Sequence, residues 1–253
     1  MAARLIAVHS FRGGTGKSNI TANVATMLAA EGRRVGIVDL DVQSPGIHAI
    51  FGFDQDRAMG HSLNDFLWGD CELADAANDV TPNADCDLSG RVWLVPSSMR
   101  PGDIARVMQQ GYDVNRLNAG LRKLANELAL DVVMLDTHPG INEETLLSIA
   151  MSNALVIVLR PDRQDYEGTR VTVAVARKLG VPQMMLVVNK APSVFDPDAI
   201  RRRVEETYDC PVAAVLPHSE DLMVLSSEGV FSLRYPDHPL TGLYRDIAVQ
   251  LTR

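Results

Sequence analysis

The stretch that decides the fold is Phe11-Arg12-Gly13-Gly14-Thr15-Gly16-Lys17-Ser18, near the start of a chain of 253 residues. It follows the apolar run Leu5–His9 and opens the helical pattern Asn19–Ala30. A glycine-rich loop that ends in Lys-Ser, between a strand and a helix, is typical of a phosphate-binding loop. Glycine permits backbone conformations that bring N–H groups close to an anion, and the N-terminus of the following helix attracts the same anion.

The residue types of this loop predict a role for each position. Backbone N–H groups are expected to bind phosphate oxygens at Gly13, Gly14, Thr15 and Gly16. The ammonium of Lys17 is expected to reach the β- and γ-phosphates, and the hydroxyl of Ser18 to bind Mg²⁺. The alternative is a glycine-rich turn that only closes a strand–helix unit. The sequence therefore predicts a site for a nucleotide and magnesium.

Outward from the loop, short apolar runs alternate with helical patterns over almost the whole chain. The runs lack polar alternation, which is typical of strands covered on both faces. They are Leu5–His9, Val35–Asp39, Val92–Val95, Val132–Asp136, Leu155–Leu159, Met185–Asn189 and Ala213–Leu216. Helices are expected at Asn19–Ala30, Val114–Leu128 and Gly168–Leu179. The alternation predicts one α/β domain, 1–253, with a doubly wound, mostly parallel sheet and helices on both faces.

Acidic residues lie at the ends of two of these strands. Asp39 and Asp41 close the second strand, and their spacing of two puts both side chains on the same side of it. Asp136 ends the run Val132-Val133-Met134-Leu135, a Walker B pattern in which the aspartate holds Mg²⁺ through water. Because ligands bind at the carboxyl edge of a parallel sheet, these carboxylates are candidates for the nucleotide site. An alternative for Asp41 is that it caps the following turn.

The loop resembles the deviant Walker A motif of the ParA/MinD family of positioning ATPases, which reads Lys-Gly-Gly-x-Gly-Lys-Ser/Thr. The resemblance covers about residues 4–250, and Arg12 stands where the family has its first lysine. In the family that lysine reaches across a nucleotide-bridged dimer to the partner's phosphates. The resemblance therefore implies an ATP-dependent homodimer in which Arg12 is a catalytic residue. A solvated charge at the mouth of the loop is the alternative for Arg12.

The same resemblance implies roles for the carboxylates. It implies that Asp41 is catalytic and orients the attacking water, and that Asp39 and Asp136 serve the magnesium ion. Gly140 is expected to bring its N–H to the γ-phosphate, as in the second switch of the family. His138 is expected to be a surface or hydrogen-bonded histidine and not a base, because the family uses none here.

The base of the nucleotide is expected at the end of the strand Met185–Asn189. Guanine-specific P-loop proteins follow Asn-Lys with x-Asp, whereas Ala191 and Pro192 follow Asn189-Lys190 here, so the carboxylate acceptor for guanine is missing. The amide of Asn189 can donate one hydrogen bond to adenine and accept another. Pro217 matches the family position whose backbone borders the adenine. The expected cofactors are therefore ATP and Mg²⁺.

The formal net charge of −8 is concentrated in one segment. Residues 54–88 hold nine acidic residues and one basic residue, and the remaining acids and bases are equal in number. We expect this segment to be an excursion from the sheet in which only Ser62–Trp68 is helical. Its acidic surface is expected to face a basic partner protein that stimulates hydrolysis.

Other features indicate which branch of the ParA/MinD family the chain resembles: the iron–sulfur carriers, the membrane-binding proteins or the DNA-binding proteins. Cys71, Cys86 and Cys210 are widely spaced and lack the pairs that an iron–sulfur carrier needs. The apolar stripe of the last helix, Leu240 to Leu251, has too few basic neighbours for a membrane surface and is expected to pack against the domain. The candidate for nonspecific DNA contact is the basic run Arg201, Arg202 and Arg203, with a solvated helical face as the alternative. With no secretory pattern at the start, a cytoplasmic protein with nucleoid association is expected.

These features favour an ATP-driven, dimerising ATPase that positions or partitions a cargo such as DNA, a protein complex or an organelle. Its hydrolysis is expected to be slow, magnesium-dependent and stimulated by a partner. The alternative is a regulatory nucleotide-binding interaction module with little turnover, which Phe11 and Arg12 motivate because both depart from the usual motif.

Overall fold

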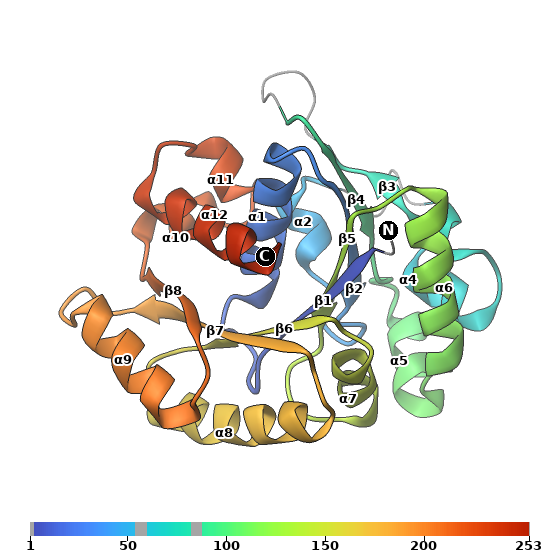
Figure 1. Ribbon diagram of the computed structural model, residues 1–253. Helices are drawn as coiled ribbons and strands as arrows, with labels where there is room; N and C mark the ends of the chain where they lie inside the picture. The colour runs from blue at the N-terminus through green and yellow to red at the C-terminus, as the bar shows by residue number, and fades with distance from the viewer. Residues whose placement is uncertain (1–2, 54–59, 82–87, 253) are drawn as a thin grey trace.

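The computed structural model describes residues 3–53, 60–81 and 88–252. These residues form an eight-stranded sheet in the order β3-β4-β2-β5-β1-β6-β7-β8 (Figure 1). The strands are β1 Arg4–His9, β2 Arg34–Leu40, β3 Asn78–Asp79, β4 Arg91–Val95, β5 Val132–Thr137, β6 Ala154–Leu159, β7 Gln183–Ala191 and β8 Val212–Pro217. Only β3 pairs antiparallel, with β4, and the other neighbours are parallel. This confirms the predicted fold class, and the seven predicted strands are all present.

Helices cover both faces of the sheet (Figure 1). One face carries α1 Lys17–Ala30, α2 Ile47–Ile50, α10 Glu220–Leu225, α11 Phe231–Arg234 and α12 Pro239–Leu251. The other carries α4 Leu63–Trp68, α5 Pro101–Gln110, α6 Val114–Glu127, α7 Glu143–Ala150, α8 Arg163–Lys178 and α9 Pro197–Tyr208. In the described ranges, none of the helices combines the length and the apolar character needed to cross a bilayer.

The helix predicted from Gly168 in fact begins at Arg163. Asp162 is its N-cap, and the Asp162 side chain accepts a hydrogen bond from the N–H of Asp165 at 3.0 Å. The prediction was wrong here because the first turn of α8 is polar and lacks the apolar spacing that marks the rest of the helix.

The acidic segment is more closely integrated into the fold than the sequence predicted. Leu63 and Phe66 of α4 and Leu73 of the short 3₁₀ helix η1 (Leu73–Ala76) are buried in the core against α6. Gly120 of α6 makes this possible, because a Cβ there would overlap the ring of Phe66. The segment then forms β3, the edge strand of the sheet. The helix predicted at Ser62–Trp68 is present as α4, and the segment also contributes η1, β3 and buried apolar side chains, which its acidic composition did not predict.

Several acidic side chains of this segment have partners within the chain. Asp65 caps α4 by accepting the N–H of Ser62 at 2.7 Å. Glu72 pairs with Lys123 at 3.1 Å, and Asp79 pairs with Arg91 at 2.6 Å. Asp54, Asp56, Asp85 and Asp87 fall outside the described residues. Some of the acidic side chains of the segment therefore stabilise the local structure.

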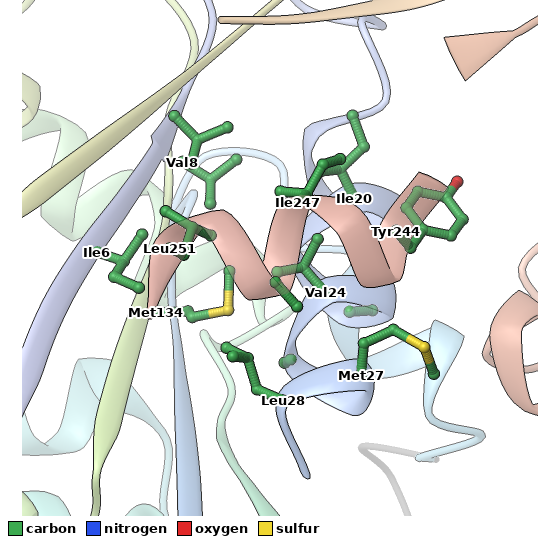
Figure 2. Close-up of a cluster of buried hydrophobic side chains, with 14 of the residues drawn as sticks. Ile6, Val8, Ile20, Val24, Met27, Leu28, Met134, Tyr244, Ile247 and Leu251 are labelled. Atoms are coloured by element: carbon green, nitrogen blue, oxygen red, sulfur yellow. The ribbon is translucent and has the colours of Figure 1, made fainter. Parts of the chain in front are cut away.

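The largest part of the core lies between the sheet and two helices, α1 and α12 (Figure 2). Ile20 and Val24 of α1 are buried together with Ile247 and Leu251 of α12. Ile6 and Val8 of β1 and Met134 of β5 form the floor of this cluster. The apolar stripe of the last helix thus packs against the domain, as predicted. Because α1 follows the phosphate loop directly, this packing also holds the loop in place.

We expect Ile247→Ala to lower the free energy of unfolding by about 2–5 kcal/mol, because it leaves a cavity in a fully buried cluster. Urea denaturation followed by circular dichroism measures the change. Val224→Ala is the matched control, because Val224 is 79% exposed on α10, and its effect should stay within about 0.5 kcal/mol. Equal losses in the two variants would contradict the importance of the α1–α12 contact.

Candidate functional site

The phosphate loop joins β1 to α1 at the carboxyl edge of the sheet. Gly14 and Gly16 have φ angles of 75° and 94°, a region that other residues rarely adopt. Gly16 also lies so close to Asn189 that a Cβ would overlap the Asn189 amide. Position 16 therefore requires glycine for two independent reasons.

Asn189 and Lys190, at the end of β7, hold the loop from the side. The Asn189 Nδ2 donates to the carbonyl oxygen of Thr15 at 2.8 Å, and its Oδ1 accepts the N–H of Lys190 at 2.9 Å. The Nζ of Lys190 donates to the carbonyl oxygen of Gly14 at 2.9 Å. Pro217 lies at the end of the neighbouring strand β8, at the same edge. Asn189, one of the two residues predicted to border the base, is thus beside the loop and also supports its backbone.

Lys17 is buried between two of the predicted carboxylates. Its side chain is 7% exposed, and its Nζ lies 3.8 Å from the Asp41 Oδ2 and 4.0 Å from the Asp136 Oδ1. A buried charge needs compensation by opposite charges nearby. The fold therefore brings together a cation from α1 and two carboxylates from the ends of β2 and β5.

Asp39 and Asp136 are direct neighbours on adjacent strands, and both are fully buried. Burial, followed by the charges of Asp136 and Asp41, holds the pKa of Asp39 well above its usual range. Burial also raises the pKa of Asp136, although the charge of Lys17 and hydrogen bonds from Ser18 and Thr21 oppose the rise. Among the residues that the structure describes, one carboxylate oxygen of each aspartate, Oδ2, has no hydrogen-bond partner.

These oxygens suit a hard divalent cation. Magnesium prefers one or two carboxylates and a hydroxyl together with phosphate oxygens. The Asp136 carboxylate and the Ser18 hydroxyl that is hydrogen-bonded to it are such ligands, and Asp39 is the neighbour of Asp136 on β2. The residues predicted to serve magnesium, Ser18, Asp39 and Asp136, therefore lie together and fit the ion chemically.

A model of the family described as ParA, NUBPL iron-transfer P-loop NTPase, matches residues 2–252. The chain belongs to the ParA family of P-loop NTPases. This confirms the resemblance drawn from the loop and its flanking strands.

Individual relatives of the family are distant. An uncharacterized ATP-binding protein of Methanocaldococcus jannaschii is 24% identical over 97% of this chain and 86% of the relative. An iron–sulfur cluster carrier protein of Pyrococcus horikoshii is 27% identical over 73% of this chain and 60% of the relative. The septum site-determining protein MinD of Pyrococcus horikoshii, solved with Mg-ADP, has a TM-score of 0.80 at 21% identity, covering 99% of this chain and 96% of that one. The structural likeness establishes the fold.

Arg12, which stands where the family motif has lysine, and Phe11 just before that motif both contact α8. The ring of Phe11 packs onto Gly168, where a Cβ would overlap it. The Arg12 Nη1 lies 3.4 Å from the Asp165 Oδ1 and 3.7 Å from the Asp162 Oδ1 within the same chain, and the Arg12 side chain is 38% exposed. A role of Arg12 across a dimer stays a prediction, and such a role would require it to leave these carboxylates.

Two histidines near the second switch were not anticipated as part of the site. The His138 Nδ1 lies 2.6 Å from the Asp41 Oδ1, so the histidine is hydrogen-bonded, as expected, but to the carboxylate predicted to be catalytic. His9 is fully buried, and burial, with Lys17 and His138 adding to it, lowers its pKa to about 3. The His138–Asp41 contact joins residues far apart in the chain, so no local pattern could reveal it.

Gly140 differs from its expected role in this structure. Its φ of 89° places its N–H against the carbonyl oxygen of Ser10, at 3.0 Å. Donation to a γ-phosphate would therefore require this hydrogen bond to break.

One arginine of the basic run of α9 is held within the chain, whereas the other two are exposed and make looser contacts. Arg201 donates to the carbonyl oxygen of Val212, and Arg202 lies 3.8 Å from a carboxylate oxygen of Asp196. The guanidinium of Arg203 lies 5.6 Å from the centre of the Tyr166 ring. The run is in the middle of α9 and not at its start. Its availability for DNA is thus smaller than three adjacent arginines suggest.

We expect Gly168→Ala to weaken ATP binding about tenfold, because the added methyl group displaces Phe11 and with it the loop. Replacing Phe11 by Ala in the same chain should restore most of the affinity, since the overlap is then removed. Titration with a fluorescent ATP analogue measures both. Gly102→Ala is a matched control, because open space surrounds a Cβ at that position on α5. Unchanged affinity in Gly168→Ala would show that Phe11 does not hold the loop.

Proposed function

We propose that this chain is a magnesium-dependent ATPase that dimerises when it binds ATP and positions or partitions a cargo. The observation that carries the proposal is the buried Lys17 ammonium between Asp41 and Asp136, at the mouth of a phosphate loop. Phosphate oxygens can replace both carboxylates as partners of Lys17, which frees Asp41 for water and Asp136 for the metal.

Each residue of the edge has a role in the proposed hydrolysis. The loop N–H groups bind the phosphates, and Lys17 binds the β- and γ-phosphate oxygens. Asp41 holds the attacking water in line with the γ-phosphoryl group. Ser18 and Asp136 would hold magnesium, with Asp39 next to Asp136, and the ion would neutralise charge on the phosphate oxygens. Asn189 and the backbone at Pro217 border the adenine.

The properties of the cysteine thiols favour cargo positioning over iron–sulfur transfer. Metal-binding cysteines are thiolates, and burial raises the pKa of both Cys71 and Cys210 to about 11. The two residues also lie in different regions, Cys71 at the core beneath α4 and α6, and Cys210 beside α8 and α9. Cys86 lies outside the described residues.

The proposed partners follow from charge. A basic partner protein would bind the acidic segment 54–88 and stimulate hydrolysis, through acids other than those that pair within the chain. Nonspecific DNA would contact Arg202 and Arg203, which are exposed, whereas Arg201 holds β8. Nucleoid association in the cytoplasm would follow from that contact.

We expect Lys17→Ala to abolish ATP-dependent dimerisation, and Asp41→Ala to keep dimerisation while lowering the hydrolysis rate about 100-fold or more. The different outcomes follow because Lys17 binds phosphate in the ground state and Asp41 acts on water. Light scattering with and without ATP and Mg²⁺ measures the first effect, and phosphate release measures the second. Chelation of magnesium should remove hydrolysis in the wild type.

The same assay tests the alternative of a regulatory module with little turnover, which the pairing of Arg12 within its own chain favours. A near-zero wild-type rate that Asp41→Ala leaves unchanged would support the module. A protein that stays monomeric with ATP at micromolar concentration would contradict the dimerising switch.

A further inference from the structure

Asp41 has a defined orientation at the edge of the sheet. Its Oδ1 lies 2.6 Å from the His138 Nδ1 and 3.2 Å from the backbone nitrogen of Ser44. Its Oδ2 faces the Nζ of Lys17 at 3.8 Å. An ionised carboxylate only accepts hydrogen bonds, so the ring N–H of His138 is the donor. Two donors on one oxygen fix the carboxylate and leave the other oxygen facing the phosphate loop.

The backbone around His138 is anchored to β1. The hydroxyl of Thr137 donates to the carbonyl oxygen of Val8 at 3.0 Å, and it lies 2.8 Å from the Nδ1 of the buried His9. On the other side of His138, the N–H of Gly140 donates to Ser10. These contacts with β1 and the residue after it fix the position of the imidazole, which links the segment after β5 to Asp41 after β2.

We propose that His138 is a positioning residue for ATP hydrolysis. Its ring N–H holds the Asp41 carboxylate so that the Oδ2 atom of Asp41 faces the attacking water. This inference rests on the proposed function, because it deepens the role of Asp41. The hydrogen bond is short and charge-assisted, the kind that constrains a carboxylate most strongly. Positioning of this type acts on the rate and not on the affinity for nucleotide.

The other contacts of Asp41 do not replace this one. The N–H of Ser44 is farther away, at 3.2 Å, and Lys17 is expected to turn to the phosphates when ATP binds. A cavity of about 130 Å³ lies beside the imidazole, lined also by Thr137 and Tyr112. Removal of the ring enlarges this space and allows Asp41 to rotate away from the loop.

The test compares three substitutions that differ in where an N–H is placed. Asn puts its amide nitrogen near the position of Nδ1, Gln puts it near Nε2, and Ala has none. We expect His138→Ala to lower the single-turnover hydrolysis rate about 10- to 100-fold while the Kd for ATP changes less than about twofold. His138→Asn should recover to within about threefold of the wild-type rate, and His138→Gln should not.

Two further variants complete the experiment. His61→Ala removes an exposed histidine outside the site and should hydrolyse ATP at the wild-type rate. In an Asp41→Ala chain, His138→Ala should cause no further loss, because the histidine acts through the aspartate.

The outcomes separate the inference from the proposed function. A wild-type rate in His138→Ala, equally slow Asn and Ala variants, or a rise in Kd that accounts for the whole loss would each overturn the positioning role alone. Wild-type protein that hydrolyses ATP no faster than Lys17→Ala would overturn the proposed function, and this inference with it.

Discussion

The arrangement of the carboxyl edge of the sheet depends on one interaction. The buried ammonium of Lys17 pairs with the carboxylates of Asp41 and Asp136. A charge removed from water costs several kcal/mol unless opposite charges surround it. Lys17 begins α1, whereas the carboxylates come from the ends of β2 and β5. Lys17 therefore joins three separate elements at the phosphate loop, where a protein of the ParA family would bind the phosphates of its nucleotide.

The remaining structure keeps that cation in place. Packing of α12 on α1 fixes the helix from behind, and Asn189 and Lys190 tie the loop backbone from the side. Phe11, where the ordinary phosphate loop has glycine, and Arg12, where the family motif has lysine, attach the front of the loop to α8. The loop is thus held on three sides by contacts that leave its N–H groups for an anion. Asp41 is also held, by its hydrogen bond with His138.

Much of this arrangement could be predicted from the sequence, because its signals are local. The run of Gly13 to Ser18 after an apolar strand indicates a phosphate loop, and the acids at strand ends predict carboxylates at the same edge of the sheet. The period-two spacing of Asp39 and Asp41 at the end of β2 predicts that both side chains lie on one side. Apolar periodicity likewise located the seven long strands and the buried stripe of α12.

What the sequence did not reveal depends on tertiary contacts. The His138–Asp41 bond and the Phe11–Gly168 contact join distant parts of the chain, so neither has a local pattern. The start of α8 depends on the Asp162 cap and not on apolar spacing. The edge strand β3 has two residues, too short for periodicity to mark. A run of three arginines predicts a basic surface, but it cannot show that Arg201 donates to a backbone carbonyl of β8.

The central claim is that Lys17 exchanges its two carboxylate partners for phosphate. A crystal structure with magnesium and a non-hydrolysable ATP analogue tests it most directly. The account predicts the Lys17 Nζ within hydrogen-bond distance of the β- and γ-phosphates, away from Asp41 and Asp136, with Ser18 and Asp136 next to the metal. An analogue bound at the loop with Lys17 still paired to both aspartates would contradict the account.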